Sequence, residues 1–166
     1  CVLLDRPAKD LTGRGAGRSD QGRRRKSWAG ETAIAANRPD PLAPLDVMAK
    51  VGGFDLAGLC GVFLGGAAYR VPVLMDGLIS TVAALCAVRL CPEAKKALLA
   101  SHVSAEPAGQ LVLDQLGKKP LITAEMRLGE GTGAVAAIPL LDMALALYRD
   151  GTTFDGYGMQ AYTPQG

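Results

Sequence analysis

The sequence predicts an α/β fold, in which helices cover a parallel β-sheet. Short apolar runs alternate along the chain with longer helical stretches, and only short joints separate them. The composition agrees, because 49% of the residues are hydrophobic but only 5% are aromatic, which favours a core of aliphatic side chains. A β-sandwich is disfavoured, since it needs more aromatic and β-branched residues. The 166 residues suffice for one packed domain and are too few for two.

Three helices are expected in the first part of the chain. A glycine-rich loop at 12–17 precedes a helix over about Asp20–Asn37. The segment Arg38–Pro44 ends that helix, because its prolines cannot continue one. A short helix follows over Leu45–Val51, and a longer one over Asp55–Arg70.

The Asp55–Arg70 helix contains several glycines, which lower its helix propensity. They are Gly58, Gly61 and Gly65. We expect these glycines to allow close packing against another backbone.

Two short strands with a helix between them are expected next. Val71–Met75 is a short apolar run with two valines, which is typical of a buried strand. A helix over Ser80–Leu90 has hydroxyl residues near its start, and a second short strand follows at Ala97–Ala100. A further helix is expected over Glu106–Leu116, with Gly117 as its stop signal.

The last third of the chain predicts a weak third strand at Pro120–Ala124 and a glycine loop at Leu128–Gly133. A long apolar helix follows over Ala134–Tyr148. We expect one domain over residues 1–154 and an irregular tail over residues 155–166.

Charge and composition exclude several function classes. The net charge of +2 argues against a dedicated nucleic-acid-binding protein. The four cysteines form no C-x-x-C pair, and a reducing cytosol suits them better than a disulfide framework. The single histidine, His102, excludes a two-histidine zinc motif, and we expect no metal.

No membrane association is expected. The longest unbroken run of apolar and glycine residues, Leu56–Tyr69, is too short to span a bilayer. Residues 1–30 are basic without a long apolar stretch, unlike a signal peptide. The chain begins with Cys1 rather than Met, so we expect it to be a fragment.

Ligands of α/β proteins bind at the carboxyl ends of the parallel strands. This rule points to Asp76-Gly77, to Ser101–Glu106 and to the loop around Glu130. Asp76 is either a ligand for a sugar hydroxyl or metal, or a turn residue next to Gly77. Ser104 and Glu106 precede an apolar helix and resemble a helix start, which is compatible with a phosphate site.

The strongest local signal is a carboxylate between glycines, directly before a helix. Glu130 lies between Gly129 and Gly131, which allow unusual backbone conformations and a close approach to a ligand. Glu130 is a candidate general base. The alternative is that it only caps the helix or interacts with its dipole.

A second glycine-rich segment, Thr12–Gly17, is followed by the basic run Arg23–Lys26. Backbone N–H groups together with a cation are typical of a phosphate site. The segment lacks the Lys-Ser/Thr pair of a P-loop. A solvent-exposed basic helix face is the alternative, and a nucleic-acid patch is a weaker one.

Four blocks resemble one protein family, in order and at its spacing. They are Val51–Asp55, Pro72–Gly77, Ser101–Glu106 and Arg127–Ala134. The family is nicotinate-nucleotide–dimethylbenzimidazole phosphoribosyltransferase, and the similarity covers roughly Thr12 to Phe154.

The resemblance implies a Rossmann-like parallel sheet flanked by helices, a smaller helical domain, a homodimer and a cytoplasmic enzyme. Members of the family are about twice this long, so the chain resembles their C-terminal half. The implied reaction transfers the phosphoribosyl group of nicotinate mononucleotide to 5,6-dimethylbenzimidazole, and gives α-ribazole 5′-phosphate and nicotinate. No cofactor or metal is implied, because the pyridinium of the nucleotide is already a good leaving group.

The resemblance assigns Glu130 as the catalytic base that removes the proton of the benzimidazole nitrogen. It places Leu128 at the base pocket and Asp76 near the ribose, with Gly129 and Gly131 beside the substrate. The residues implied around the 5′-phosphate are Gly13, Gly15, Lys26 and Ser104. The alternative function is an inactive fragment that binds only nucleotide phosphate and requires the missing N-terminal half.

Overall fold

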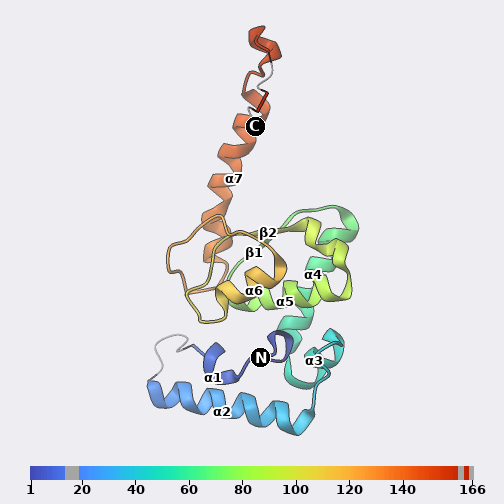
Figure 1. The fold of residues 1–166 in the computed structure, drawn as a ribbon, viewed down its shortest axis with the longest axis vertical. Helices are drawn as coiled ribbons and strands as arrows, with labels where there is room; N and C mark the ends of the chain where they lie inside the picture. The colour runs from blue at the N-terminus through green and yellow to red at the C-terminus, as the bar shows by residue number, and fades with distance from the viewer. Residues whose placement is uncertain (14–18, 161–162, 165–166) are drawn as a thin grey trace.

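The computed structural model describes residues 1–13, 19–160 and 163–164 (Figure 1). The α-helices in these residues are α1 (Ala8–Leu11), α2 (Asp20–Asn37), α3 (Pro44–Val51), α4 (Phe54–Tyr69), α5 (Leu78–Leu90), α6 (Gly109–Leu116) and α7 (Thr132–Asp150). The strands are β1 (Val73–Met75) and β2 (Leu98–Ala100), and short 3-10 helices lie at Val2–Leu4, Pro92–Ala97 and Asp155–Tyr157.

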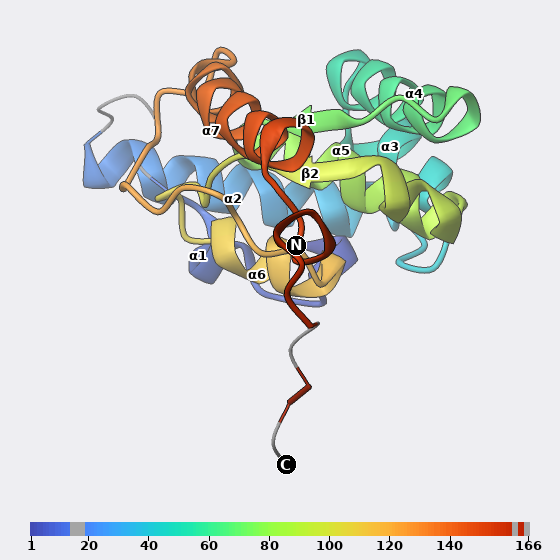
Figure 2. The same cartoon turned by 90° about the horizontal axis from the view of Figure 1, so that it is seen from above.

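The two strands form a small parallel sheet, which confirms the predicted α/β class. Val73 pairs with Leu98, and Met75 pairs with Ala100. Parallel strands need a long crossover connection, and α5 provides it here. Figure 2 shows the two strands side by side.

The predicted third strand, Pro120–Ala124, is reduced to one isolated parallel bridge between His102 and Ile122. The Ile122 N–H donates to the Ser101 carbonyl at 2.9 Å, and the Val103 N–H donates to the Ile122 carbonyl at 3.1 Å. A proline opens this segment and has no N–H for a ladder, so pairing begins only after it. The segment extends the sheet by a short stretch beside β2.

Helix α5 lies at the centre of the core. Its fully buried alanines are Ala83, Ala84 and Ala87. These small side chains let α4 and α6 both pack against α5. Near the end of α5, the Arg89 guanidinium donates hydrogen bonds to the carbonyls of Leu3 and Pro41, so α5 also anchors the N-terminal segment.

The helix predicted over Asp55–Arg70 is observed as α4, but the reason given for its glycines is wrong. A Cβ would meet nothing within 4 Å at Gly58, Gly61 or Gly65. The close approach is at Gly66 instead, where a Cβ would overlap the Val73 side chain and lie 2.9 Å from the Val71 carbonyl oxygen. Helix propensity shows that these glycines are unfavourable in a helix, but it does not show which of them faces β1.

Five of the six predicted helices begin one to three residues away from the predicted start, and the local reason is visible for α5 and α6. Helix α5 begins at Leu78, before the predicted Ser80, because the Ser80 hydroxyl donates back to the Gly77 carbonyl at 2.9 Å from inside the first turn. Helix α6 begins at Gly109, after the predicted Glu106. The residues in between form a turn, in which the Gly109 N–H donates to the Glu106 carbonyl at 2.8 Å.

Helix α2 has the predicted bounds, and the Ser19 hydroxyl caps it by accepting the Gly22 N–H at 3.3 Å. None of its side chains is buried, and the basic run Arg23–Lys26 is exposed on it. Together with α1 and α3 it lies at the opposite end of the molecule from α7 (Figure 1).

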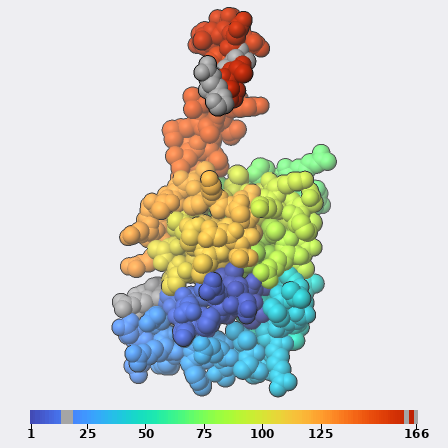
Figure 3. Space-filling model, viewed as in Figure 1, coloured from blue at the N-terminus to red at the C-terminus, as the bar shows by residue number. Residues whose placement is uncertain are grey.

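Helix α7 begins in the body of the protein and then projects away from it (Figures 1 and 3). Within α7, only Gly133 and Ala137 are buried. Among the described residues, α7 alone is long and apolar enough to cross a membrane by length and composition, with 11% of its apolar window buried. A search for unbroken apolar runs does not find this helix, because Asp142 interrupts it.

The first turn of α7 packs on the ring of His102, which is only 2% exposed. A Cβ on Gly133 would overlap this ring. The ring is fixed from behind, because its Nδ1 lies 3.1 Å from the Ser101 hydroxyl, which itself donates to the Met75 carbonyl. Gly133 therefore allows α7 to begin against the ends of the strands.

Gly133→Ala is expected to lower the free energy of unfolding by about 1–3 kcal/mol, because the added methyl group has no room beside His102. The matched control is Gly61→Ala in α4, where a Cβ meets open space. This control is expected to raise the free energy of unfolding by about 0.5–1 kcal/mol, through helix propensity alone. Urea denaturation measures both, and equal effects would contradict the packing of α7 on His102.

The four thiols are expected to react at two very different rates. Cys60 and Cys86 are 2% and 1% exposed, and burial raises the pKa of the Cys86 thiol to about 11. Burial also raises the pKa of Cys60, whereas Cys1 is exposed and Cys91 is partly exposed. With a chromogenic disulfide reagent at pH 8, two thiols should react at once and two only on unfolding. Immediate reaction of all four would show that the core is open.

Candidate active site

A cavity of about 700 Å³ lies where the carboxyl ends of the parallel strands meet the loop before α7. Asp76, directly after β1, lines it, as do Ser104 after β2 and Glu130 before α7. The three segments that the strand-end rule selects therefore surround one cavity. This is the usual position of a ligand in a parallel α/β sheet.

Every predicted site residue that the structure describes lines this cavity. They are Gly13, Lys26, Asp76, Ser104, Leu128, Gly129, Glu130 and Gly131. Gly15, which was predicted with them, lies outside the described residues. Residues that are more than a hundred positions apart in the chain are thus brought to one place.

The loop that carries Glu130 has three successive residues in the left-handed region. The φ angles are 76° at Gly129, 55° at Glu130 and 80° at Gly131. Glycine adopts this conformation freely, but for Glu130 it costs about 1–2 kcal/mol. The loop is closed by Thr132, whose hydroxyl donates to the Gly129 carbonyl at 2.8 Å. Strain of this kind is concentrated at functional sites.

The Asp76 carboxylate holds the start of α7. Its Oδ2 accepts the Gly131 N–H at 3.1 Å, and its Oδ1 accepts the N–H groups of Gly133 at 2.8 Å and Ala134 at 3.1 Å. Asp76 is fixed in turn, because its own N–H donates to the Ser80 hydroxyl at 2.8 Å. The sequence leaves Asp76 as a ligand or a turn residue, and the structure shows it satisfying free N–H groups of a helix N-terminus.

The wall formed by the N-terminal segment is tight at Gly13 and cationic at Lys26. A Cβ on Gly13 would overlap the Glu106 carboxylate and lie 2.9 Å from Cδ of Pro107. The Ser104 hydroxyl accepts the Glu106 N–H at 3.3 Å, which shapes the loop after β2. Lys26 is exposed on α2 and also lines the cavity.

Four further polar residues line the cavity, although the sequence does not predict them as site residues. They are Ser80, His102, Glu106 and Arg127. The positions of His102 and Glu106 after β2 are the available signal, but the sequence pattern around Glu106 also fits a helix start. Within the described part of the chain, no three His, Cys, Asp or Glu side chains are grouped so that they could hold a metal ion.

The cavity thus combines a carboxylate on a pre-formed loop with cations and hydroxyl groups in the same space. A carboxylate of this kind can accept a proton from a bound substrate. Lys26, Arg127 and the Ser104 hydroxyl are suited to a phosphate ester. The arrangement suits a phosphorylated substrate that loses or transfers a group close to Glu130.

Comparison with known proteins gives consistent matches. A relative from Acetivibrio thermocellus is 49% identical over 164 residues, which are 99% of this chain and 47% of that protein. A relative from Roseiflexus sp. is 49% identical over 158 residues, which cover 95% and 45% of the two chains. Both are called nicotinate-nucleotide–dimethylbenzimidazole phosphoribosyltransferase. The chain spans about half the length of the curated relatives it matches.

Solved structures agree with the sequence matches. The crystal structure of CobT from Thermus thermophilus superposes with a TM-score of 0.87 at 38% identity, over 96% of this chain and 47% of that one. The family model described as phosphoribosyltransferase matches residues 1–158. The resemblance carried by the four sequence blocks is confirmed, and the chain belongs to the phosphoribosyltransferase family.

Proposed function

We propose that this protein takes part in the transfer of the phosphoribosyl group of nicotinate mononucleotide to 5,6-dimethylbenzimidazole. The products are α-ribazole 5′-phosphate, used in cobalamin nucleotide-loop assembly, and nicotinate. The observation that carries the proposal is the strained loop that presents Glu130 to a cavity lined by Lys26 and Ser104. The relatives that match nearly the whole chain bear the name of this activity.

In this proposal Glu130 is the general base. It takes the proton from one nitrogen of the benzimidazole, while the other nitrogen attacks the anomeric carbon of the ribose. The bond from that carbon to the pyridinium nitrogen breaks, and nicotinate leaves with the bonding electron pair. The left-handed loop supports this role, because it fixes the Glu130 backbone before substrate binds. The neighbouring residue Leu128 is 71% exposed and offers an apolar contact for the benzimidazole ring.

The 5′-phosphate is proposed to bind at the other wall of the cavity. Lys26 supplies a positive charge, and Ser104 supplies a hydroxyl group. Gly13 belongs to this site by resemblance, and its missing Cβ leaves room for the Glu106 carboxylate. Gly15 belongs to the proposed phosphate site by resemblance, and Asp76 is proposed to lie near the ribose.

The partners proposed for this protein are its two small-molecule substrates and a second copy in a homodimer, in the cytoplasm. Helix α7 supports the proposal of a protein partner, because it exposes a series of large apolar side chains. They are Val135, Ile138, Leu140, Met143, Leu145, Leu147 and Tyr148. An exposed apolar surface of this extent marks an interaction site.

A second candidate function is binding of nucleotide phosphate without turnover. The cavity is open, and this chain spans about half the length of its relatives. Binding of nicotinate mononucleotide without formation of α-ribazole phosphate would favour this second function.

The test is an assay in which nicotinate mononucleotide and dimethylbenzimidazole are supplied and α-ribazole phosphate is detected by mass. The purified chain is assayed alone and together with the part of the Acetivibrio thermocellus relative that it does not match. Glu130→Gln is expected to lower kcat about 10²- to 10⁴-fold, because the amide cannot accept the proton. Turnover close to that of the unmodified protein would remove Glu130 from the role of base.

Lys26→Ala is expected to raise KM for nicotinate mononucleotide about tenfold or more, while kcat changes little, because the phosphate contact is far from the reacting bond. The matched control is Arg24→Ala, which removes an exposed cation from the same helix but does not line the cavity. Steady-state kinetics separate the two effects. If both variants had the same KM, the 5′-phosphate would not bind at Lys26.

A further inference from the structure

The conformation of the loop around Glu130 has to be held in place by other contacts. Glu130 is exposed, and its φ of 55° is unfavourable for a residue with a side chain. Without other contacts, the loop would lower its free energy if the Glu130 backbone returned to the extended or helical region. The contacts that prevent this determine where the Glu130 carboxylate stands.

The Asp76 carboxylate makes three hydrogen bonds that reach both sides of Thr132. It accepts from Gly131, the residue next to Glu130, and from Gly133 and Ala134 in the first turn of α7. One side chain therefore ties the loop and the helix to the end of β1. A carboxylate that accepts several backbone N–H groups is a strong, charge-assisted anchor.

These bonds leave Asp76 little capacity for a ligand. A carboxylate oxygen has about two acceptor directions, and Oδ1 already accepts two N–H groups. Oδ2 accepts a third N–H, from Gly131. A sugar hydroxyl that took over one of these directions would release part of the loop.

We propose that Asp76 is a positioning residue for Glu130: its hydrogen bonds to Gly131, Gly133 and Ala134 hold the base in its reactive place. The inference rests on the proposed function, in which Glu130 is the general base. It goes beyond the proposal that Asp76 lies near the ribose, because here Asp76 acts through the loop.

Asp76→Asn tests this with a small change in volume. The amide keeps one oxygen, which can still accept from Gly133 and Ala134, but it turns an NH₂ donor toward the Gly131 N–H. The variant is expected to lower kcat about 10- to 100-fold, because displacing a catalytic group by about 1 Å has effects of this size. KM for nicotinate mononucleotide is expected to stay within about twofold, since the loop N–H groups already take up most of the Asp76 carboxylate.

A double-mutant cycle separates positioning from any other role. If Asp76 acts only through Glu130, Asp76→Asn has no base left to displace in the E130Q background. The double variant is then expected to be within about twofold of E130Q alone. The same 10- to 100-fold loss in both backgrounds would overturn the proposal, and so would a raised KM with an unchanged kcat.

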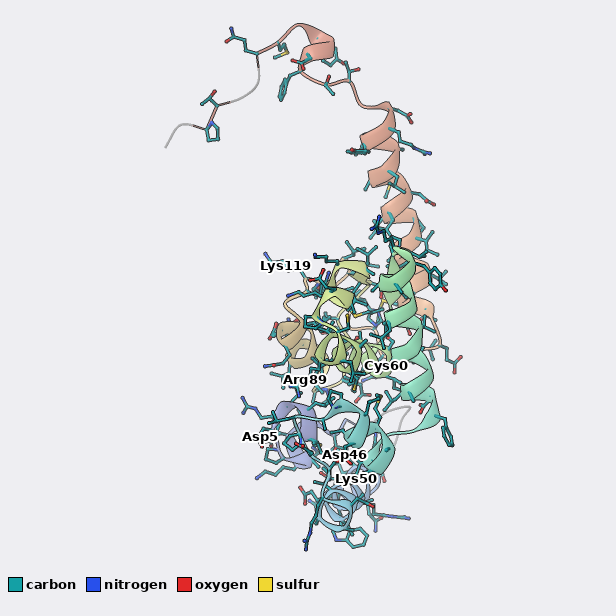
Figure 4. The ribbon with its side chains drawn as sticks, turned by 90° about the vertical axis from the view of Figure 1, so that its right-hand side faces the viewer. Asp5, Asp46, Lys50, Cys60, Arg89 and Lys119 are labelled. Atoms are coloured by element: carbon teal, nitrogen blue, oxygen red, sulfur yellow. The ribbon has the colours of Figure 1, made fainter. Side chains whose placement is uncertain are left out.

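Asp46→Asn is the matched control. The Asp46 carboxylate accepts the Asp40 N–H at 2.8 Å and pairs with Lys50 at 2.9 Å, at the end of the molecule opposite α7 (Figure 4). The same chemical change is made there, and it weakens only hydrogen bonds and an ion pair at the start of α3. This variant is expected to be less stable and to keep kcat and KM. A loss of kcat equal to that of Asp76→Asn would show that destabilisation alone explains both.

Amide hydrogen exchange tests the positioning without any turnover. In the unmodified protein, the N–H groups of Gly131, Gly133 and Ala134 are expected to be protected, and Asp76→Asn should speed their exchange about tenfold or more, because their acceptor is weakened. Unchanged exchange would overturn the proposal. If no preparation forms product, the proposed function fails, and the exchange rates still decide whether Asp76 holds the loop.

Discussion

The interaction on which the site depends is the carboxylate of Asp76 at the N-terminus of α7. It joins the end of β1 to a loop more than fifty residues later in the chain, through three main-chain N–H groups. Because these N–H groups have no partner within the helix, an acceptor from outside has to satisfy them. The same bonds that begin α7 also place Glu130 over the cavity. Helix geometry and site geometry thus share one constraint.

Much of the fold follows from local signals in the sequence. Helix α2 has the predicted bounds because Ser19 caps its start and a proline-containing segment follows its end. Gly117 ends α6 at a φ of 58°, as a stop signal of this type should. The position of the close contact at Gly66 was not predictable, because it depends on which face of α4 meets β1. The same holds for the third strand, whose pairing depends on a neighbour rather than on its own residues.

The candidate site was predictable to a similar degree. The strand-end rule selects the segments after β1 and β2, and both line the cavity with Glu130. The sequence alone does not determine the role of Asp76, because no local pattern shows that its partners lie fifty-five to fifty-eight residues away. Arg127 lines the cavity but is not predicted as a site residue, because an arginine before a glycine loop has no spacing that is typical of a binding site. Packing between distant segments decides these cases.

The left-handed backbone at Glu130 sets stability against activity at a single position. Glycine at this position would remove the steric strain and, on that account, stabilise the loop. It would also remove the carboxylate on which the proposed chemistry depends. Random substitution followed by selection for thermal stability would therefore favour loss of this side chain, and only selection for turnover would retain it. In the proposed function, the reaction is what retains a side chain at this position in spite of the strain.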